Sequence, residues 1–434
     1  MTLVRKSSDM RPGDDGYINV QEGKTMMTLK GHTKSMFFLT QLIDGRLISG
    51  GDDKTLKIWD TVSGICLMTL QGHTDSIYCL IQLTDGRVVS GGSSGAIKIW
   101  DIISGSCLAT LEGHTSFVSC MLQLTDGRLA SSSADSTVRI WHINCGCFMV
   151  LGGHSGVVRF VIQLTDGRLV SGGDDHILGI WDIISYDTIS RSLIHLIGHT
   201  NAVFCATLLT DGRIVSGSVD NTLRVWDTVS GSCLMTLKGH TDALIDVIQL
   251  NDGRLVSCSF DTTLKVWDIM SGNCLMTLHG HTGYVACMTQ LDNDQLVSGS
   301  CDRTLKKWDT ISGRCLTTLE GHAGFVFRVI QLTDARLVSA SEDNTIKIWN
   351  IMSLSEQKWI RRRPLLLLFE ASKILSEPPE SEVILQERYM RRHLVLLLRC
   401  CLNIRNGLIN LKTFKITLTV LSNSYLVHRI TAYL

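Results

Sequence analysis

The sequence repeats itself with a period of about forty residues over most of its length. The pair Gly-His occurs eight times at spacings of 41, 41, 40, 45, 41, 41 and 41 residues, and one Trp follows each pair before the next begins. A unit of this length is a supersecondary element that stacks on its copies, so the chain is predicted to form a repeat architecture. The repeated histidines and tryptophans are His32, His73, His114, His154, His199, His240, His281 and His322, and Trp59, Trp100, Trp141, Trp181, Trp226, Trp267, Trp308 and Trp349.

Each unit has the pattern of a small antiparallel sheet. In the second unit, Val88–Gly91 and Ala96–Trp100 alternate apolar and polar residues with the period of a β-strand. Thr84–Arg87 contains Asp-Gly, a strong signal for a tight hairpin turn. A further strand, such as Cys66–Leu70, follows Ser-Gly. Both faces of such a sheet are largely apolar, so each unit must pack against its neighbours.

The two ends of the repeat array predict how it closes. The strand pattern that precedes each Gly-His also precedes the first one, as Thr25–Leu29, although no unit comes before it. The matching stretch after Trp349, Glu356–Ile360, has lost the pattern. The N-terminal strand is therefore expected to complete the last sheet, which leaves no exposed end. We predict an all-β fold: a single closed eight-bladed β-propeller of four-stranded antiparallel blades, followed by a C-terminal tail with helices.

The Gly-His and Trp-Asp ends of the units resemble the WD-repeat family of β-propellers over about 330 residues. The resemblance implies a buried hydrogen-bonded chain in which Asp accepts from His, His from Ser, and Ser from the Trp indole. Its members are His32, Ser49, Asp53 and Trp59 in the first unit, and His240, Ser257, Asp261 and Trp267 in the sixth. The second unit has Ser94 in place of Asp, so His73 is expected to find another partner or to leave that blade softer.

Ser, His and Asp also form the catalytic triads of hydrolases, which gives these residues a second interpretation. A hydrolase needs one such set with an exposed nucleophile, whereas here the set recurs in nearly every unit beside a Trp whose N–H needs an acceptor. We therefore interpret the sets as structural, and predict no catalytic residue and no enzyme activity. A propeller hydrolase stays as an alternative, which exposure of a network Ser beside its His would favour.

The resemblance also implies which positions contact partners: the third and fifth residues after each His, and the residue before the repeated Asp. Eight of these twenty-four residues are Phe or Tyr, against 6% aromatic residues in the whole chain. Aromatic side chains with an occasional Arg are typical anchors of protein interfaces. The predicted partner-binding residues are Phe37, Tyr78, Phe117, Arg159, Asp174, Phe204, Phe260, Tyr284, Phe325, Phe327 and Glu342.

The cysteines do not indicate zinc or disulfides, although the chain has fifteen. Six recur at one position of the unit and none belongs to a Cys-x-x-Cys pair, so we predict small buried apolar side chains at that position. These are Cys66, Cys107, Cys147, Cys233, Cys274 and Cys315. No phosphate loop or metal-ligand cluster stands out, and we predict no metal and no cofactor.

Charge separates the tail from the repeats. The whole chain has a formal charge of zero, but residues 354–434 contain thirteen Lys and Arg against six Glu, a net charge of +7. We predict an N-terminal polar segment at 1–23, the propeller at 24–352, and a basic C-terminal extension at 353–434 that is partly helical or poorly ordered. The N-terminus lacks the apolar run of a secretion signal, so we expect an intracellular protein, in the cytoplasm or alternatively in the nucleus.

These features favour a non-catalytic scaffold or adaptor that binds other proteins or peptides on the propeller rim and channel mouth. Three alternatives belong to other classes: a substrate-recognition subunit of a ubiquitin ligase recruited without an F-box, lipid or nucleic-acid association through the basic tail, and the propeller hydrolase. A peripheral membrane contact through the tail is compatible with its basic amphipathic stretch, Glu387–Arg405. The zero net charge argues against a nucleic-acid-binding footprint spread over the whole surface, and no obligate homo-oligomer is expected.

Overall fold

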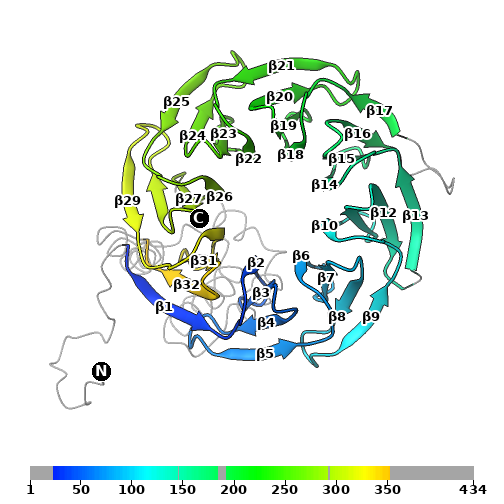
Figure 1. Cartoon of the computed structure of the whole chain (residues 1–434), viewed down its shortest axis with the longest axis vertical. Helices are drawn as coiled ribbons and strands as arrows, with labels where there is room; N and C mark the ends of the chain where they lie inside the picture. The colour runs from blue at the N-terminus through cyan, green and yellow to red at the C-terminus, as the bar shows by residue number, and fades with distance from the viewer. Residues whose placement is uncertain (1–22, 145, 184–191, 292–293, 352–434) are drawn as a thin grey trace, which may run out of the picture. The chain divides into compact units, whose positions relative to one another are not determined.

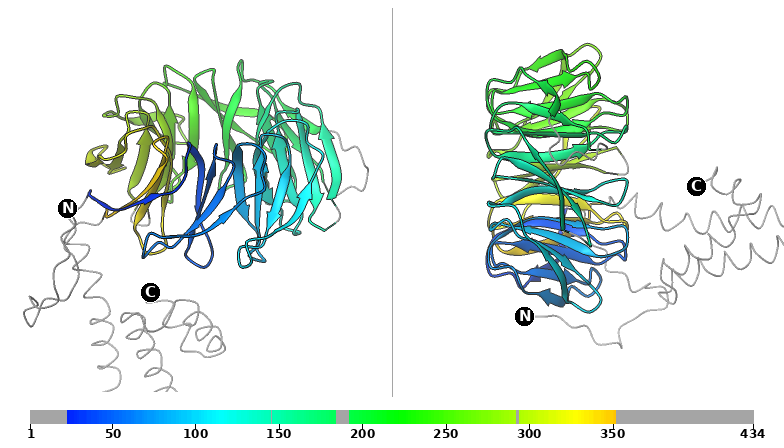
Figure 2. Two further views of the ribbon diagram at one scale, coloured as in Figure 1. Left: turned by 60° about the horizontal axis from the view of Figure 1, so that its bottom comes forward. Right: turned by 90° about the vertical axis from the view of Figure 1, so that its right-hand side faces the viewer.

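The computed structural model describes residues 23–144, 146–183, 192–291 and 294–351. In this part of the chain, thirty-two strands form eight four-stranded antiparallel sheets around a central channel (Figure 1). Seen from the side, the eight sheets form a disc, with the strands running across its thickness (Figure 2). The predicted closed eight-bladed propeller is confirmed. The predictions for residues 1–22 and 352–434, including the helical tail, lie outside the described residues.

Each blade places its four strands in order from the channel to the circumference. The innermost strands are β2 (Met36–Gln41), β6 (Ile77–Gln82), β10 (Val118–Gln123), β14 (Val158–Gln163), β18 (Val203–Leu208), β22 (Leu244–Gln249), β26 (Val285–Gln290) and β30 (Val326–Gln331). The second strands are β3 (Leu47–Gly51), β7 (Val88–Gly92), β11 (Leu129–Ser133), β15 (Leu169–Gly173), β19 (Ile214–Ser218), β23 (Leu255–Ser259), β27 (Leu296–Ser300) and β31 (Leu337–Ser341).

The remaining strands form the outer half of each blade. The third strands are β4 (Leu56–Trp59), β8 (Ile97–Trp100), β12 (Thr137–His142), β16 (Leu178–Trp181), β20 (Thr222–Trp226), β24 (Leu264–Trp267), β28 (Leu305–Trp308) and β32 (Thr345–Trp349). The outermost strands are β5 (Cys66–Leu70), β9 (Cys107–Leu111), β13 (Gly146–Gly152), β17 (Ser192–Leu196), β21 (Cys233–Lys238), β25 (Cys274–Leu278), β29 (Cys315–Leu319) and β1 (Thr25–Lys30).

The hydrophobic core lies between neighbouring blades and not within any one of them. Ile48 and Ile58 of the first blade pack in one buried cluster with Ile77, Val88 and Trp100 of the second. The second strand of every blade is buried along its whole length because a neighbouring blade covers each of its faces. A sheet with two apolar faces is stable only when both are covered, so the blades stabilise one another around the ring.

The first and last blades join through β1, as the orphan strand pattern predicted. Strand β1 pairs antiparallel with β32, with Leu29 opposite Ile346 and Thr25 opposite Trp349. Leu29 is 1% exposed and lies in a cluster that also contains Trp59 of the first blade. The closing contact is therefore built from the same interblade packing as the others.

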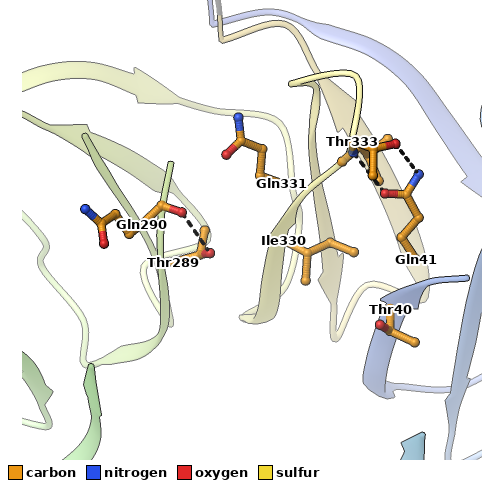
Figure 3. A pocket seen from close by; sticks show the side chains of 8 residues that line it. Thr40, Gln41, Thr289, Gln290, Ile330, Gln331 and Thr333 are labelled. Carbon is orange, nitrogen blue, oxygen red and sulfur yellow. Dashed lines mark hydrogen bonds between the residues drawn. The ribbon is translucent and has the colours of Figure 1, made fainter. Parts of the chain in front are cut away.

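Polar side chains also connect successive blades, at the ends of the innermost strands. Gln41 accepts a hydrogen bond from the backbone N–H of Thr333 at 2.9 Å (Figure 3). It also donates to the Gly45 carbonyl of its own turn at 3.1 Å. The amide group suits this position because it offers both a donor and an acceptor. Five other glutamines accept a hydrogen bond from a backbone N–H of the preceding blade in the same way: Gln82 from Ile43, Gln123 from Thr84, Gln163 from Thr125, Gln249 from Thr210 and Gln290 from Asn251.

The prediction that the six repeated cysteines are buried is wrong. Cys107, Cys147, Cys233, Cys274 and Cys315 are exposed, Cys66 is half-buried, and all are free thiols. Most of them begin the outermost strand, where no further strand covers the outer edge of the blade. An apolar residue that recurs at one position indicates a common environment, but the pattern does not distinguish an interior strand from an edge strand.

Candidate functional site

The ring has two faces with different chemistry. The connection between blades, which carries the repeated His, and the turn between the second and third strands, which carries the repeated Asp, lie at the same ends of the strands. We call this side the network face. The turns between first and second strands and between third and fourth strands lie on the opposite face.

The repeated polar residues form a continuous chain of hydrogen bonds just beneath the network face. In the first blade, the indole N–H of Trp59 donates to Ser49 Oγ at 2.8 Å. Ser49 Oγ lies 2.7 Å from His32 Nε2, and His32 Nδ1 lies 2.8 Å from Asp53 Oδ2. An ionised carboxylate only accepts, so Nδ1 carries the proton and Nε2 accepts from the Ser hydroxyl.

The same chain recurs wherever the blade has its Asp. In the sixth blade, His240 Nδ1 lies 2.7 Å from Asp261, His240 Nε2 lies 2.8 Å from Ser257, and Trp267 donates to Ser257 at 2.8 Å. Burial by itself would raise the pKa of Asp261, but hydrogen bonds from His240, Thr263 and the Thr241 backbone hold that pKa well below its ordinary value. Each network Asp is thus a fixed negative charge near the surface.

The network serines do not have the geometry of a nucleophile. Ser49 and Ser257 are 0% exposed, as are their six counterparts in the other blades. Each Oγ already accepts from an indole and contacts a His, so no substrate carbonyl can approach it. This burial gives the hydrolase alternative no support.

The second blade keeps only part of the chain. His73 Nε2 lies 2.7 Å from Ser90, and Trp100 donates to Ser90 at 2.8 Å, but Ser94 supplies no carboxylate. Burial, with a contribution from the nearby positive charge of Lys98, lowers the pKa of His73 to about 4. His73 therefore keeps its contact to Ser90 although its blade has no carboxylate at the position of the repeated Asp.

Seven of the predicted partner-binding residues form a continuous row of aromatic rings around the channel mouth. We call this row the aromatic arc, and it crosses six of the eight blades. Its neighbouring ring centroids are 4.7 to 6.4 Å apart, within the range of favourable aromatic contacts. In order around the ring, its members are Phe260, Tyr284, Phe325, Phe327, Phe37, Tyr78 and Phe117.

Part of the arc owes its position to a bulge in the innermost strand. The register of β30 with β31 shifts between Val326 and Arg328, so Phe327 is an extra residue with no direct partner. Phe37 and Tyr78 occupy the same bulge in their blades. A bulge bends the strand and re-aims a side chain, which brings these rings into contact across blade boundaries. Periodicity alone did not predict this bulge.

The other predicted residues lie outside the arc or beside it. Arg159 and Asp174 form an ion pair with Nε and Oδ1 2.6 Å apart, and the Arg159 guanidinium lies 4.3 Å from the Phe204 ring centroid. These two charges neutralise each other. Glu342 is exposed and its Oε2 accepts from the Phe325 backbone N–H at 3.4 Å, which places it beside the arc.

Two charged residues of the innermost strands were not among the predicted sites. Asp246 and Arg328 occupy the strand position that holds Cys79, Cys205 or Cys287 in other blades. Burial raises the pKa of Asp246 to about 6, against the opposing effect of the positive Arg328. The signal was present in the sequence, because both residues are charged at an otherwise apolar position of the repeat.

The face opposite the network face carries an open hollow, exposed apolar turns and paired arginines. An open hollow of about 450 Å³ at the inner strand ends is lined by amide, hydroxyl and aliphatic side chains, among them Gln41, Gln290 and Ile330 (Figure 3). Five apolar turn residues there are 78% to 86% exposed: Val62, Ile103, Val229, Met270 and Ile311. The arginines in the turns between first and second strands pair with nearby carboxylates, as Arg336 does with Asp334 at 2.6 Å.

The described residues contain neither a metal-binding cluster nor a membrane-spanning helix. No group of three or more His, Cys, Asp or Glu side chains there is arranged to hold a metal ion. The described part of the chain also contains no helix of the length and apolarity that crossing a membrane requires.

Comparisons with known proteins agree with this geometry. The family model described as WD domain, G-beta repeat matches eight times, at residues 23–60, 64–101, 105–142, 145–182, 190–227, 231–268, 272–309 and 313–350. Among solved structures, the crystal structure of the computationally designed Ika8 protein is similar, with a TM-score of 0.67 and 32% identity. That match covers 76% of this chain and 100% of the designed one. No curated protein matches the chain.

Proposed function

Because the chain belongs to the WD-repeat family of β-propellers, we propose that it is a scaffold or adaptor that binds partner proteins through the aromatic arc of its network face. WD-repeat propellers are generally non-catalytic scaffolds for protein interactions. The buried Ser-His-Asp chains fit that role, since they hold the turns of the network face in place and leave no free nucleophile.

The observation that carries this proposal is the continuity of the arc across six blades. Its rings are only partly covered, and Tyr78 and Phe260 are each 38% exposed. Rigid aromatic side chains supply a large contact area at a small entropic cost, and truncating such an anchor typically weakens a protein interface by about 2 to 4 kcal/mol. A partner that covers the arc would remove this apolar surface from water.

We also propose an intracellular location. Twelve cysteines in the described residues are free thiols, and five of them are exposed on the circumference. Exposed thiols persist in reducing compartments, whereas oxidising ones favour disulfides. Retention of full thiol reactivity in protein isolated from cells under non-reducing conditions would support this location, and blocked or cross-linked thiols would contradict it.

The test of the binding face compares two triple variants in affinity capture from cell extracts with mass spectrometry. The arc variant changes Phe117, Tyr284 and Phe325 to Ala. The control variant changes Val62, Ile103 and Met270 to Ala, which removes exposed apolar side chains from the opposite face. Thermal melts of both variants establish that the propeller still folds.

Partners captured by the intact protein should be lost from the arc variant and retained by the control. Cross-links from those partners should fall on the network face. Loss of the partners from the control variant alone, or an unchanged set from the arc variant, would show that the binding face has been misplaced.

A further inference from the structure

We propose that one end of the aromatic arc is a pocket for a positively charged side chain, Lys or Arg, of the bound partner. The pocket consists of the rings of Phe260, Tyr284 and Phe325 with the carboxylate of Glu342, and we call it the cation pocket. This inference rests on the proposed function and names the chemistry of the partner.

The three rings come from three successive blades and contact one another in a row. The centroids of Phe260 and Tyr284 are 4.7 Å apart with planes tilted by 41°, and those of Tyr284 and Phe325 are 6.1 Å apart with planes at 66°. Non-parallel rings present both a face and an edge to the space between them. Glu342 lies against this group, with its Oε2 3.4 Å from the Phe325 backbone nitrogen.

Backbone hydrogen bonds fix the segments that carry these side chains. The Phe260 N–H donates to the Ala243 carbonyl at 2.9 Å, the Cys301 N–H to the Tyr284 carbonyl at 3.0 Å, and the Glu342 N–H to the Phe325 carbonyl at 2.8 Å. Each bond ties a turn between the second and third strands to the residue that precedes the innermost strand of its own blade. The backbone of the cation pocket is therefore ordered without a partner, which lowers the entropic cost of binding.

Glu342 is the charged group of the cation pocket at neutral pH. Burial raises the pKa of Tyr284 to about 12, with further contributions from Cys301 and Glu342. Burial likewise raises the pKa of Cys301 to about 11. The phenol and the thiol therefore stay neutral, and Glu342 carries the charge among the side chains of the cation pocket.

The network carboxylates beneath this face add negative charge near the cation pocket. Seven network carboxylates lie just below the face, and Asp261, Asp302 and Asp343 belong to the three blades of the pocket. Their pKa values lie well below the ordinary value, so they are ionised at neutral pH. Fixed negative charges of this kind attract cationic partners and repel acidic ones.

A cation fits this combination better than an apolar side chain does. The faces of aromatic rings are electron-rich and attract ammonium and guanidinium groups. An apolar side chain would remove the Glu342 carboxylate from water without supplying an opposite charge, which is unfavourable. A guanidinium or ammonium would stack on the rings and pair with the carboxylate at the same time.

The test uses immobilised nonapeptides whose central residue is Arg, Lys, citrulline or norleucine, with aliphatic residues varied at the flanking positions. Citrulline has nearly the shape of Arg without its charge. The intact protein should bind Arg or Lys peptides at least tenfold more tightly than their citrulline and norleucine counterparts. Glu342→Gln should abolish this preference, because it removes the carboxylate and keeps the size of the side chain.

The matched control is Glu112→Gln, which removes the same charge from an exposed residue outside the cation pocket. This variant should keep the preference for Arg or Lys. An equal loss in both variants would mean that only the general charge of the face acts, and would overturn the pocket. Citrulline peptides that bind as well as Arg peptides, tighter binding of acidic or phosphorylated peptides, or a library without any binder would also overturn it.

The two proposals fail in different ways. If the arc variant loses its cellular partners while peptides show no preference for a cation, the scaffold proposal stands and the cation pocket is wrong. If the arc variant keeps its partners while Glu342→Gln abolishes selective binding of Arg peptides, the pocket binds cations but is not the docking site of those partners.

Discussion

Replacing Asp246 with Asn should stabilise the propeller at neutral pH and have little effect under acidic conditions. The pKa of this carboxyl is raised from 3.8 to about 6 in the folded protein because burial disfavours its charged form. Below pH 3.8 the carboxyl is protonated in both the folded and the unfolded chain, and it costs nothing. As the pH rises toward 6, the unfolded chain ionises first, so the folded state loses relative stability.

The size of this cost follows from the difference between the two pKa values. At 1.36 kcal/mol for each tenfold change in the protonation equilibrium, a change from 3.8 to about 6 corresponds to ~3 kcal/mol above pH 6. Asp246 is half-buried on the innermost strand, and contact with water in the channel reduces the expected gain to about 2 kcal/mol. Asn has nearly the same size and can still accept from the Val247 N–H as Asp246 does at 2.9 Å.

The assay is denaturant unfolding at pH 4 and pH 7.5, together with hydrogen exchange of the amides in β22 and β23. Exchange is needed because an array of repeats can open locally and need not unfold in one step. Glu112→Gln is the control, since it removes an exposed carboxylate with no change in the core. A gain that is the same at both pH values, or absent at pH 7.5, would refute the reasoning.

Arg328 provides a second check on the same reasoning. Its positive charge lowers the pKa of Asp246, so Arg328→Gln should destabilise the parent protein at pH 7.5 more than it destabilises the Asp246→Asn variant. Arg328 also lies 5.3 Å from the Phe38 ring centroid, and the double-mutant cycle separates that contact from the charge interaction. Equal effects in both backgrounds would mean that the two charges do not interact.

Two further changes address the network and the ring closure. Ser94→Asp should supply the missing carboxylate of the second blade and raise the pKa of His73 from about 4. The blade should then lose less stability as the pH falls below 6.5. An unchanged NMR titration of His73 would contradict this. Leu29→Asp should cost more than about 3 kcal/mol and expose the edge of the last blade, producing larger species in light scattering, because Leu29 is 1% exposed. Met26→Asp in the same strand should have little effect, because Met26 is 45% exposed, and equal damage from both changes would argue against a closing role for buried Leu29.

Local patterns predicted the architecture because each rule acts within about forty residues. The eight Gly-His and Trp signals gave the number of blades, and the orphan strand at Thr25–Leu29 predicted the closure with β32. The resemblance to WD-repeat propellers implied the buried chain of His32, Ser49, Asp53 and Trp59, which the structure contains. Constant spacing in a repeat means constant geometry, so the chain recurs in the blades that keep its Asp.

The tertiary structure decided which of the variable residues meet. The sequence by itself determined a ring of eight sheets and nominated Phe260, Tyr284, Phe325 and Glu342 among the residues of one face. Only the curvature of the ring and the placement of each side chain bring these residues from three blades together, and the same geometry pairs Arg159 with Asp174 at 2.6 Å. Such contacts join residues from different repeats, or a bulge residue to the neighbouring turn of its own blade, so spacing along the chain carries no record of them.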